Sequence, residues 1–286
     1  MSAPGRLKIG FVGAGKVGAV LAAALRAADH DIVGVSGSSP ATLERIDTML
    51  PGVPVMSIED VVTHSELVFF TLPDDVLPEM VSGLAKLHVF KPGQLLAHTS
   101  GRHGAALFEP ATGALGMAIH PAMTFTGTSL DIGRMVGCGF AVTAANTLLP
   151  IAQALVIEVG GNPQVVAEED RPLYHAALAH ASNHTATIIA QSSQMLAEVG
   201  IDNTGEYLGP LVHASIDNAL NLGPTALTGP LVRGDVKTIA AHLEVLKPAE
   251  KQTYKALALS TLKRLQKQPF FFMPSETISQ LEELLS

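Results

Sequence analysis

The sequence predicts an α/β fold, with a doubly wound, mainly parallel sheet in residues 1–166 followed by an all-α domain in residues 167–286. Short apolar runs alternate with helical segments through the first half, as expected of a parallel sheet that helices cover on both faces. From residue 168 onward every remaining segment has helical periodicity. A length of 286 residues is sufficient for two domains of ordinary size.

The first half contains a repeated alternation of strand and helix. The predicted strands are short, nearly continuous apolar runs at residues 7–12, 31–36, 67–72, 94–98, 115–119 and 139–143. The predicted helices have a longer period and are bounded by Gly, Ser or Pro, at residues 16–28, 39–50 and 78–87. This order predicts a βαβ unit at the start of the chain and a sheet that extends to about residue 166.

A long helix opens the second half. Acidic residues at 168–170 and Pro172 are typical of a helix start, and no breaker follows until Gly200. At 1.5 Å per residue the helix would span roughly 40 Å, which suits the centre of a helical domain or a dimer interface. We expect a homodimer through the helical domain, although burial within one subunit fits the same pattern. Further helices are predicted at residues 205–221, 235–246 and 248–268 and from residue 274.

The composition disfavours several classes of partner. The chain has 18 Lys and Arg against 26 Asp and Glu, a formal net charge of −8, so we expect neither nucleic acid nor an anionic membrane but a small-molecule substrate. The single cysteine, Cys138, cannot form an internal disulfide, which fits a reducing compartment. The N-terminus imitates a secretory signal, but glycines interrupt its apolar run, and no stretch has the roughly 18 apolar residues of a membrane span. We therefore expect a cytoplasmic protein.

The strongest motif follows the first predicted strand and opens the first helix. The first glycine of such a motif allows a tight turn, the second lets a pyrophosphate approach the backbone, and the third lets the helix pack on the strand. Free N–H groups at the helix N-terminus then face the phosphates. The residues predicted to bind a dinucleotide here are Gly13, Ala14, Gly15, Lys16, Val17 and Gly18.

The residue at the end of the second predicted strand helps to distinguish an NAD site from an NADP site. A carboxylate there would accept the ribose hydroxyls of NAD, whereas this chain has Ser36, followed by Gly37, Ser38 and Ser39. Hydroxyl groups beside a helix start can hold a phosphate, and Arg45 lies within the helix that follows. The sequence therefore favours NADP over NAD, although Ser38 or Ser39 also fits a simple helix cap.

Polar or turn residues follow the predicted strands at residues 67–72, 94–98 and 115–119. Ligands of open α/β sheets bind at the carboxyl ends of strands, so we expect these residues near the nicotinamide end of the cofactor. His98 also fits a packed core histidine, and Asp74 also fits a turn. The candidate cofactor contacts are Leu72, Pro73, Asp74, Thr99 and Ser100, and His120 is a candidate acid or base.

A polar stripe on the long helix supplies further candidates. At 100° per residue Ser182 lies about 20° and Asn183 about 80° from His175, so the stripe either faces a substrate or makes interhelical hydrogen bonds. Arg233 stands in a tight connection rich in Gly and Pro, where it fits either a substrate carboxylate or a surface ion pair. Two histidines four residues apart on another face lack further ligands, so no metal site is predicted.

Five segments together carry a resemblance. They are GFVGAGKVG near the start, HTSG at residues 98–101, AIHPAMTF at 118–125, YHAALAHASN at 174–183 and ALTGPLVRGD at 226–235. The chain resembles Rossmann-like proteins with a C-terminal helical domain of unknown function and, more distantly, the 6-phosphogluconate dehydrogenase-like superfamily, which includes pyrroline-carboxylate and ketopantoate reductases. The resemblance implies an NADP-binding oxidoreductase fold that is usually dimeric through its helical half. It implies no particular substrate.

One departure from the superfamily concerns the catalytic acid. Its hydroxyacid dehydrogenases and ketopantoate reductases carry a lysine four residues before an asparagine on the long helix. Asn183 matches that asparagine, but Ala179 occupies the position of the lysine. A proton would then have to come from His175, His120 or a water molecule, whereas a protonated imine substrate would relax that need.

We therefore expect an NADP-dependent oxidoreductase that transfers hydride to or from a small C=O or C=N substrate in an interdomain cleft. His120 and His175 are the expected acid and base, Ser182 and Asn183 would orient the substrate, and Arg233 would bind an anionic group. One alternative is a non-catalytic NADP(H)-binding sensor or interaction protein, which the missing lysine favours. Another is a deazaflavin-linked NADP oxidoreductase.

Overall fold

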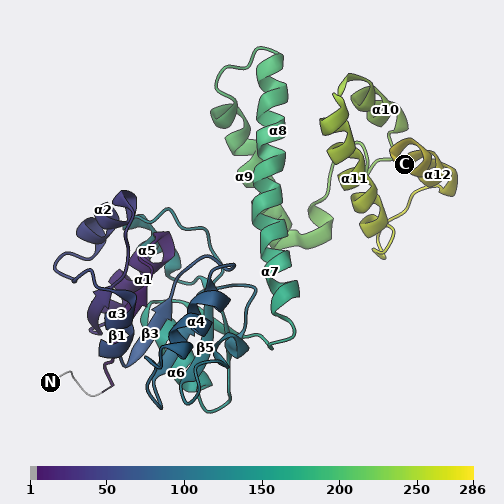
Figure 1. The fold of residues 1–286 in the computed structure, drawn as a ribbon. Helices are drawn as coiled ribbons and strands as arrows, with labels where there is room; N and C mark the ends of the chain where they lie inside the picture. Colours follow the sequence, from purple (N-terminus) through teal and green to yellow (C-terminus); the bar gives the residue numbers. More distant parts are fainter. Residues whose placement is uncertain (1–4) are drawn as a thin grey trace. The chain divides into compact units, whose positions relative to one another are not determined.

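The computed structural model describes residues 5–286 (Figure 1). The chain divides into two compact units, Met1–Ser182 and Asn183–Ser286. The division lies later in the chain than the domain boundary expected after residue 166, since the helix that follows this boundary packs with the first unit. The expected domains, 1–166 for the cofactor and 167–286 for the substrate and the dimer, stay a prediction.

A seven-stranded sheet is the centre of the first unit, with the strand order β2-β1-β3-β4-β5-β6-β7. Every neighbouring pair is parallel except β5 with β6, which is antiparallel. The predicted doubly wound, mainly parallel sheet is therefore confirmed. Its strands are β1 (Lys8–Val12), β2 (Asp31–Val35), β3 (Leu67–Phe70), β4 (Leu95–His98), β5 (Leu115–Pro121), β6 (Gly139–Ala144) and β7 (Asn162–Val165).

Helices cover both faces of this sheet, and several of them were not predicted. The sequence did not indicate α3, α5 or α6, which have seven, six and ten residues. It also did not indicate β7, whose residues NPQV have no strand-like apolar pattern and are mostly exposed. The helices of the first unit are α1 (Lys16–Ala27), α2 (Pro40–Met49), α3 (Ile58–His64), α4 (Leu77–Lys86), the 3₁₀ helix η1 (Ala105–Phe108), α5 (Leu130–Met135), α6 (Leu149–Glu158) and α7 (Arg171–Ala179).

Two apolar clusters, one on each face of the sheet, hold the first unit together. Alternate residues of β3 serve different clusters: Leu67 and Phe69 pack with α1, α2 and α6, whereas Val68 and Phe70 pack with α3 and α4. All four are at most 1% exposed, and burial of each such side chain contributes about 1.5–3 kcal/mol. Strands buried on both faces explain the nearly continuous apolar runs in the sequence.

The long helix predicted from Arg171 to Val199 is not a regular α-helix. A π-helical segment, η2 (His180–His184), separates α7 from α8 (Thr185–Glu198). Ser182 and Asn183 lie within this segment, so the angles calculated for them with 100° per residue were wrong. The division between the two units also passes between these two residues.

The second unit consists of helices, as the sequence predicts. A small core joins α10 (Val236–Val245), α11 (Pro248–Leu265) and α12 (Ser275–Leu285) through Ile239, Leu262 and Leu281. The remaining elements are α8, α9 (Thr204–Leu222) and the 3₁₀ helix η3 (Gly223–Ala226). Among residues 5–286 no helix combines the length and apolar character that crossing a membrane requires.

Candidate functional site

The glycine-rich loop between β1 and α1 has the geometry that its motif predicts. Gly13 has φ +94°, and a Cβ there would lie 2.9 Å from both Leu72 and the Thr71 carbonyl oxygen. A Cβ at Gly18 would collide with the Thr71 hydroxyl and the Gly13 carbonyl, so this glycine permits the close helix–strand packing. At Gly15, in contrast, an added Cβ would meet nothing within 4 Å. The loop is therefore tight at its two ends and open in its middle.

Two hydroxyl groups from neighbouring strands hold this loop in place. The backbone N–H of Gly13 donates to Ser36 Oγ over 2.9 Å, and the Thr71 hydroxyl donates to the Gly13 carbonyl. Ser36 is only 7% exposed, so the residue expected to contact the cofactor also anchors the loop. Ser39 caps α2 by accepting from the Thr42 N–H over 3.2 Å, while Ser38 is exposed.

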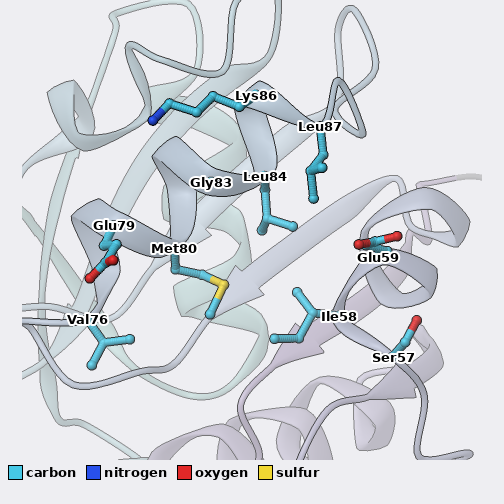
Figure 2. A pocket seen from close by; sticks show the side chains of 10 residues that line it. All are labelled: Ser57, Ile58, Glu59, Val76, Glu79, Met80, Gly83, Leu84, Lys86 and Leu87. Carbon is cyan, nitrogen blue, oxygen red and sulfur yellow. The ribbon is translucent and has the colours of Figure 1, made fainter.

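An apolar groove runs between α3 and α4 and begins at the carboxyl edge of the sheet (Figure 2). Its volume is about 910 Å³. Ile58 and Met80 point toward one another across it, and Val76 lies at one end. Val55 pairs with Val35, the last residue of β2, which places the start of α3 beside the end of that strand. The apolar side chain of Ile58, at the start of α3, therefore lies near the end of β2.

The loop after β4 is fixed by its own side chains. His98 Nε2–H donates to the Gly104 carbonyl over 2.9 Å, and its Nδ1 accepts from the Ser100 N–H over 3.2 Å. The Ser100 hydroxyl accepts from the N–H groups of Arg102 and His103. Burial lowers the pKa of His98 to about 4, so this histidine is neutral and structural at pH 7.

The same loop touches the turn after β3. His103 Nε2 lies 3.2 Å from the Asp74 carbonyl, and the backbone N–H of Thr99 donates to the Phe70 carbonyl over 3.3 Å. Leu72 lies against Gly13 of the glycine-rich loop. The candidate residues Leu72, Asp74, Thr99 and Ser100 therefore lie along one edge of the sheet, where the sequence predicts the cofactor.

Arg171, which the sequence did not single out, is fully buried beneath this edge. Its guanidinium donates to the carbonyls of Ser100, Ala118 and Ala141 over 2.8–3.1 Å and to the Thr143 hydroxyl over 2.9 Å. These acceptors come from the end of β4 and from β5 and β6, so one side chain ties three strands together. No carboxylate lies within ion-pair distance of it among the described residues.

Three aromatic side chains meet above Gly101. His120, at the end of β5, has its Nδ1 2.9 Å from the Tyr174 hydroxyl, and its ring lies 6.0 Å from that of His175. A Cβ at Gly101 would lie 2.9 Å from His120 Nε2 and 2.6 Å from His175 Cδ2. A side chain at this position would displace one of the two rings, so the glycine lets His120 and His175, two candidates from distant segments, converge with Tyr174.

The electrostatic environment keeps His120 neutral. Burial, together with the positive charge of Arg171, lowers its pKa to about 4. Burial also raises the pKa of the Tyr174 hydroxyl, so the tyrosine keeps its proton at neutral pH. The pair thus carries two mobile protons: one on the phenol and one on either nitrogen of the imidazole.

The other predicted catalytic residues lie elsewhere in the chain. Ser182 is the last residue of the first unit, whereas Asn183 and Arg233 belong to the second. Their proximity to His120 stays a prediction. Within residues 5–286 no group of three or more His, Cys, Asp or Glu side chains could hold a metal ion.

The parallel sheet, the glycine-rich turn and the polar carboxyl edge define a Rossmann-like dinucleotide-binding fold. A family profile described as a Rossmann-like domain matches residues 2–121, and a domain of unknown function, DUF2520, matches residues 138–261. The chain therefore combines a Rossmann-like domain with a C-terminal DUF2520 domain. A search of curated proteins finds no match to the sequence.

Solved structures share the fold at low sequence identity. A candidate NADP oxidoreductase from Bacteroides fragilis has a TM-score of 0.77 and 21% identity, covering 90% of this chain and 98% of its own. A Plasmodium falciparum pyrroline carboxylate reductase with NADP bound has a TM-score of 0.57 and 13% identity, covering 98% of each chain. An imine reductase from Myxococcus stipitatus in complex with NAD⁺ has a TM-score of 0.59 and 15% identity, covering 96% and 99%.

Proposed function

We propose that the protein is an NADP-dependent oxidoreductase that reduces a small C=N or C=O substrate, or oxidises the corresponding amine or alcohol. The observation that carries the proposal is the Tyr174–His120–His175 cluster above Gly101, on the same edge of the sheet as the glycine-rich loop. A dinucleotide that follows this edge would extend from the loop toward the cluster. The solved reductases with the same fold support this class of reaction.

The residues of the edge fit a dinucleotide. The open space at Gly15 leaves the backbone accessible to a pyrophosphate, and no side chain caps the N-terminus of α1. Ile58, Val76 and Met80 of the apolar groove would contact the adenine ring, and Ser38 would face the adenosine ribose. Thr99 and Ser100 would border the nicotinamide. The bound cofactor supplies or accepts a hydride.

His120 and Tyr174 can supply the proton that reduction needs. With the imidazole proton on Nε2, His120 can donate it to the substrate nitrogen or oxygen while its Nδ1 accepts the proton of the Tyr174 hydroxyl. Tyr174 is then reprotonated from water. In the reverse direction, Tyr174 first gives its proton to water; Nε2 then accepts a proton from an amine or alcohol while the Nδ1 proton passes to the Tyr174 oxygen. His175 borders the same space and would help to orient the substrate.

We further propose that the chain forms a homodimer through α8 and α9. Helix α8 has no buried residue, and Leu208 is the only buried one in α9. Large apolar side chains of α9 are exposed, with Tyr207 at 62%, Leu211 at 65% and Leu220 at 81%. A pair of helices with so little core needs another surface, and a second copy of the same pair would provide one.

The first experiment measures binding of NADPH and NADH by fluorescence to the wild type and to the Gly15→Asp variant. Gly15 has φ −66° and is the N-cap of α1, a position that favours aspartate, so this variant will fold while its carboxylate repels a pyrophosphate. The control is Gly133→Asp, where an added Cβ also meets nothing within 4 Å. We expect loss of binding in Gly15→Asp alone.

Oxidation of bound NADPH by a panel of cyclic imines and oxo acids tests the reaction itself. Turnover of any of these substrates, reduced by alanine at His120, would support the reductase. Binding of NADPH with no turnover across the panel would favour the sensor alternative. Binding of neither nucleotide by the wild type would contradict the proposed function.

A further inference from the structure

Two cationic side chains from separate helices converge on Gly127. A Cβ at this glycine would lie 2.6 Å from Nε of Arg45 in α2 and 2.9 Å from Cγ of Lys16 in α1. Gly127 itself has φ +83°, a backbone conformation that favours glycine. The loop after β5 therefore passes directly over the first residue of α1, at the end of the glycine-rich loop.

Asp131 holds this loop in place. Its buried carboxylate accepts from the N–H groups of Thr126 and Gly127 over 2.7 and 2.8 Å and from the Thr126 hydroxyl over 3.0 Å. Burial alone would raise the pKa of Asp131, but the hydrogen bonds from Gly127 and Thr126 outweigh it and keep the pKa below its ordinary value. The carboxylate stays ionised, so Gly127 is firmly positioned against Arg45 and Lys16.

Neither cation has an acidic partner. Among residues 5–286 no carboxylate oxygen lies within 4.0 Å of the Arg45 or Lys16 nitrogens. Glu44 lines the same cavity of about 370 Å³ between α2 and residues 126–129, but it makes no ion pair with Arg45. Two cationic side chains that lack an acidic partner, beside the glycine-rich loop, favour the binding of an anion there.

We infer that Arg45, held by Gly127 beside Lys16, is the residue that selects a phosphorylated adenosine ribose and thus NADP over NAD. The cavity begins at Ala41, in the first turn of α2, three residues after the exposed Ser38. An arginine side chain points back toward the N-terminus of its own helix, which directs Arg45 toward this end. Lys16 opens α1 and would contact the pyrophosphate that both dinucleotides share.

This inference rests on the proposed binding of NADP, and it gives the two cations different roles. Arg45 contacts the 2′-phosphate only, so its loss weakens the binding of NADPH and leaves the binding of NADH unchanged. Lys16 contacts the pyrophosphate that both dinucleotides share, so its loss weakens the binding of both. A charge-assisted hydrogen bond of Arg45 corresponds to a change in affinity of about tenfold or more.

The test measures dissociation constants by calorimetry for NADPH, NADH, 2′,5′-ADP and 5′-AMP. The variants are Arg45→Gln, Arg45→Lys, Lys16→Gln and Gly127→Ala, and the control is Arg26→Gln. Arg26 lies in the last turn of α1, roughly 15 Å along the helix from Lys16, and contacts the Pro51 carbonyl. Circular dichroism of each variant establishes that it is folded.

We expect Arg45→Gln to weaken the binding of NADPH and 2′,5′-ADP about tenfold or more without changing the dissociation constants of NADH and 5′-AMP. Arg45→Lys, which keeps the charge, should lose less affinity for NADPH than Arg45→Gln. Gly127→Ala, whose Cβ displaces Arg45, should also lose part of the affinity for NADPH. An unchanged ratio of NADPH to NADH affinity in folded Arg45→Gln would overturn the inference while leaving the proposed function intact. Binding of neither nucleotide by the wild type would overturn both.

Discussion

The hydroxyl of Tyr174 lies 2.9 Å from Nδ1 of His120, although 54 residues separate them in the chain. The two rings are nearly perpendicular, with an interplanar angle of 88° and centroids 5.6 Å apart. Because Nδ1 is occupied by the phenol, the other ring nitrogen is left for the space above Gly101. The tyrosine therefore fixes the orientation of the imidazole and can exchange a proton with it.

Replacement of Tyr174 by Phe tests this relationship. We expect kcat for NADPH oxidation to fall roughly tenfold to a hundredfold with little change in KM, because proton transfer is impaired and binding is not. Stopped-flow fluorescence of bound NADPH measures the rate. A larger change in KM than in kcat would contradict a role in proton transfer.

The chain contains a matched control for that variant. Tyr254 and His242 form a second pair with the same hydroxyl–Nδ1 distance of 2.9 Å, in the second unit. Tyr254→Phe removes the same kind of hydrogen bond from a pair that includes none of the candidate residues. We expect it to leave kcat unchanged. The comparison separates a general effect of losing a tyrosine hydroxyl from the loss of proton transfer between Tyr174 and His120.

Arg171 stabilises the edge and contributes, after burial, to the low pKa of His120. Arg171→Met removes the hydrogen bonds from the guanidinium to the carbonyls of Ser100, Ala118 and Ala141, which we expect to lower the free energy of unfolding by about 3 kcal/mol. The same change removes a positive charge that lowers the pKa of His120, so this pKa should rise from about 4. Urea denaturation and a histidine NMR titration measure the two effects.

Arg171→Lys separates hydrogen bonding from charge. It keeps the positive charge but cannot reach all the carbonyls at once, so we expect a loss of stability with the pKa of His120 still low. An equal rise of this pKa in both variants would contradict the electrostatic role of Arg171.

Acid should destabilise the fold before carboxylates titrate. Burial holds the pKa of His98 at about 4 in the folded protein, against 6.5 for the ordinary group. Between these values the unfolded chain binds a proton that the folded chain does not, so stability is full above pH 6.5 and falls as pH decreases toward 4. We expect a loss of roughly 2 kcal/mol from His98 between pH 7.5 and 5, measured by urea denaturation. The slope should be smaller in His98→Gln.

The sequence predicts the parts of the site that depend on local patterns and misses those that depend on tertiary contacts. The glycine motif is predictable because each glycine meets a requirement of its own strand–turn–helix unit. Arg171 is not, because its acceptors at residues 100, 118 and 141 lie on separate strands. The π-helical segment at His180–His184 is also missed, since periodicity arguments assume a regular helix. Tyr174 stands beside a predicted residue, but only its contact with β5 reveals a role.

The exposed apolar surface of α9 leads to a prediction about assembly. Leu220 is 81% exposed, so a charge there changes little within one copy of the chain, whereas a dimer formed through α8 and α9 would bury it. We expect sedimentation to show a dimer for the wild type and a monomer for Leu220→Glu. Val245→Glu on α10 introduces the same charge at a residue that is also 81% exposed, and it should stay dimeric. A monomeric wild type would contradict the proposed dimer. Dissociation of both variants alike would contradict a dimer contact through α8 and α9.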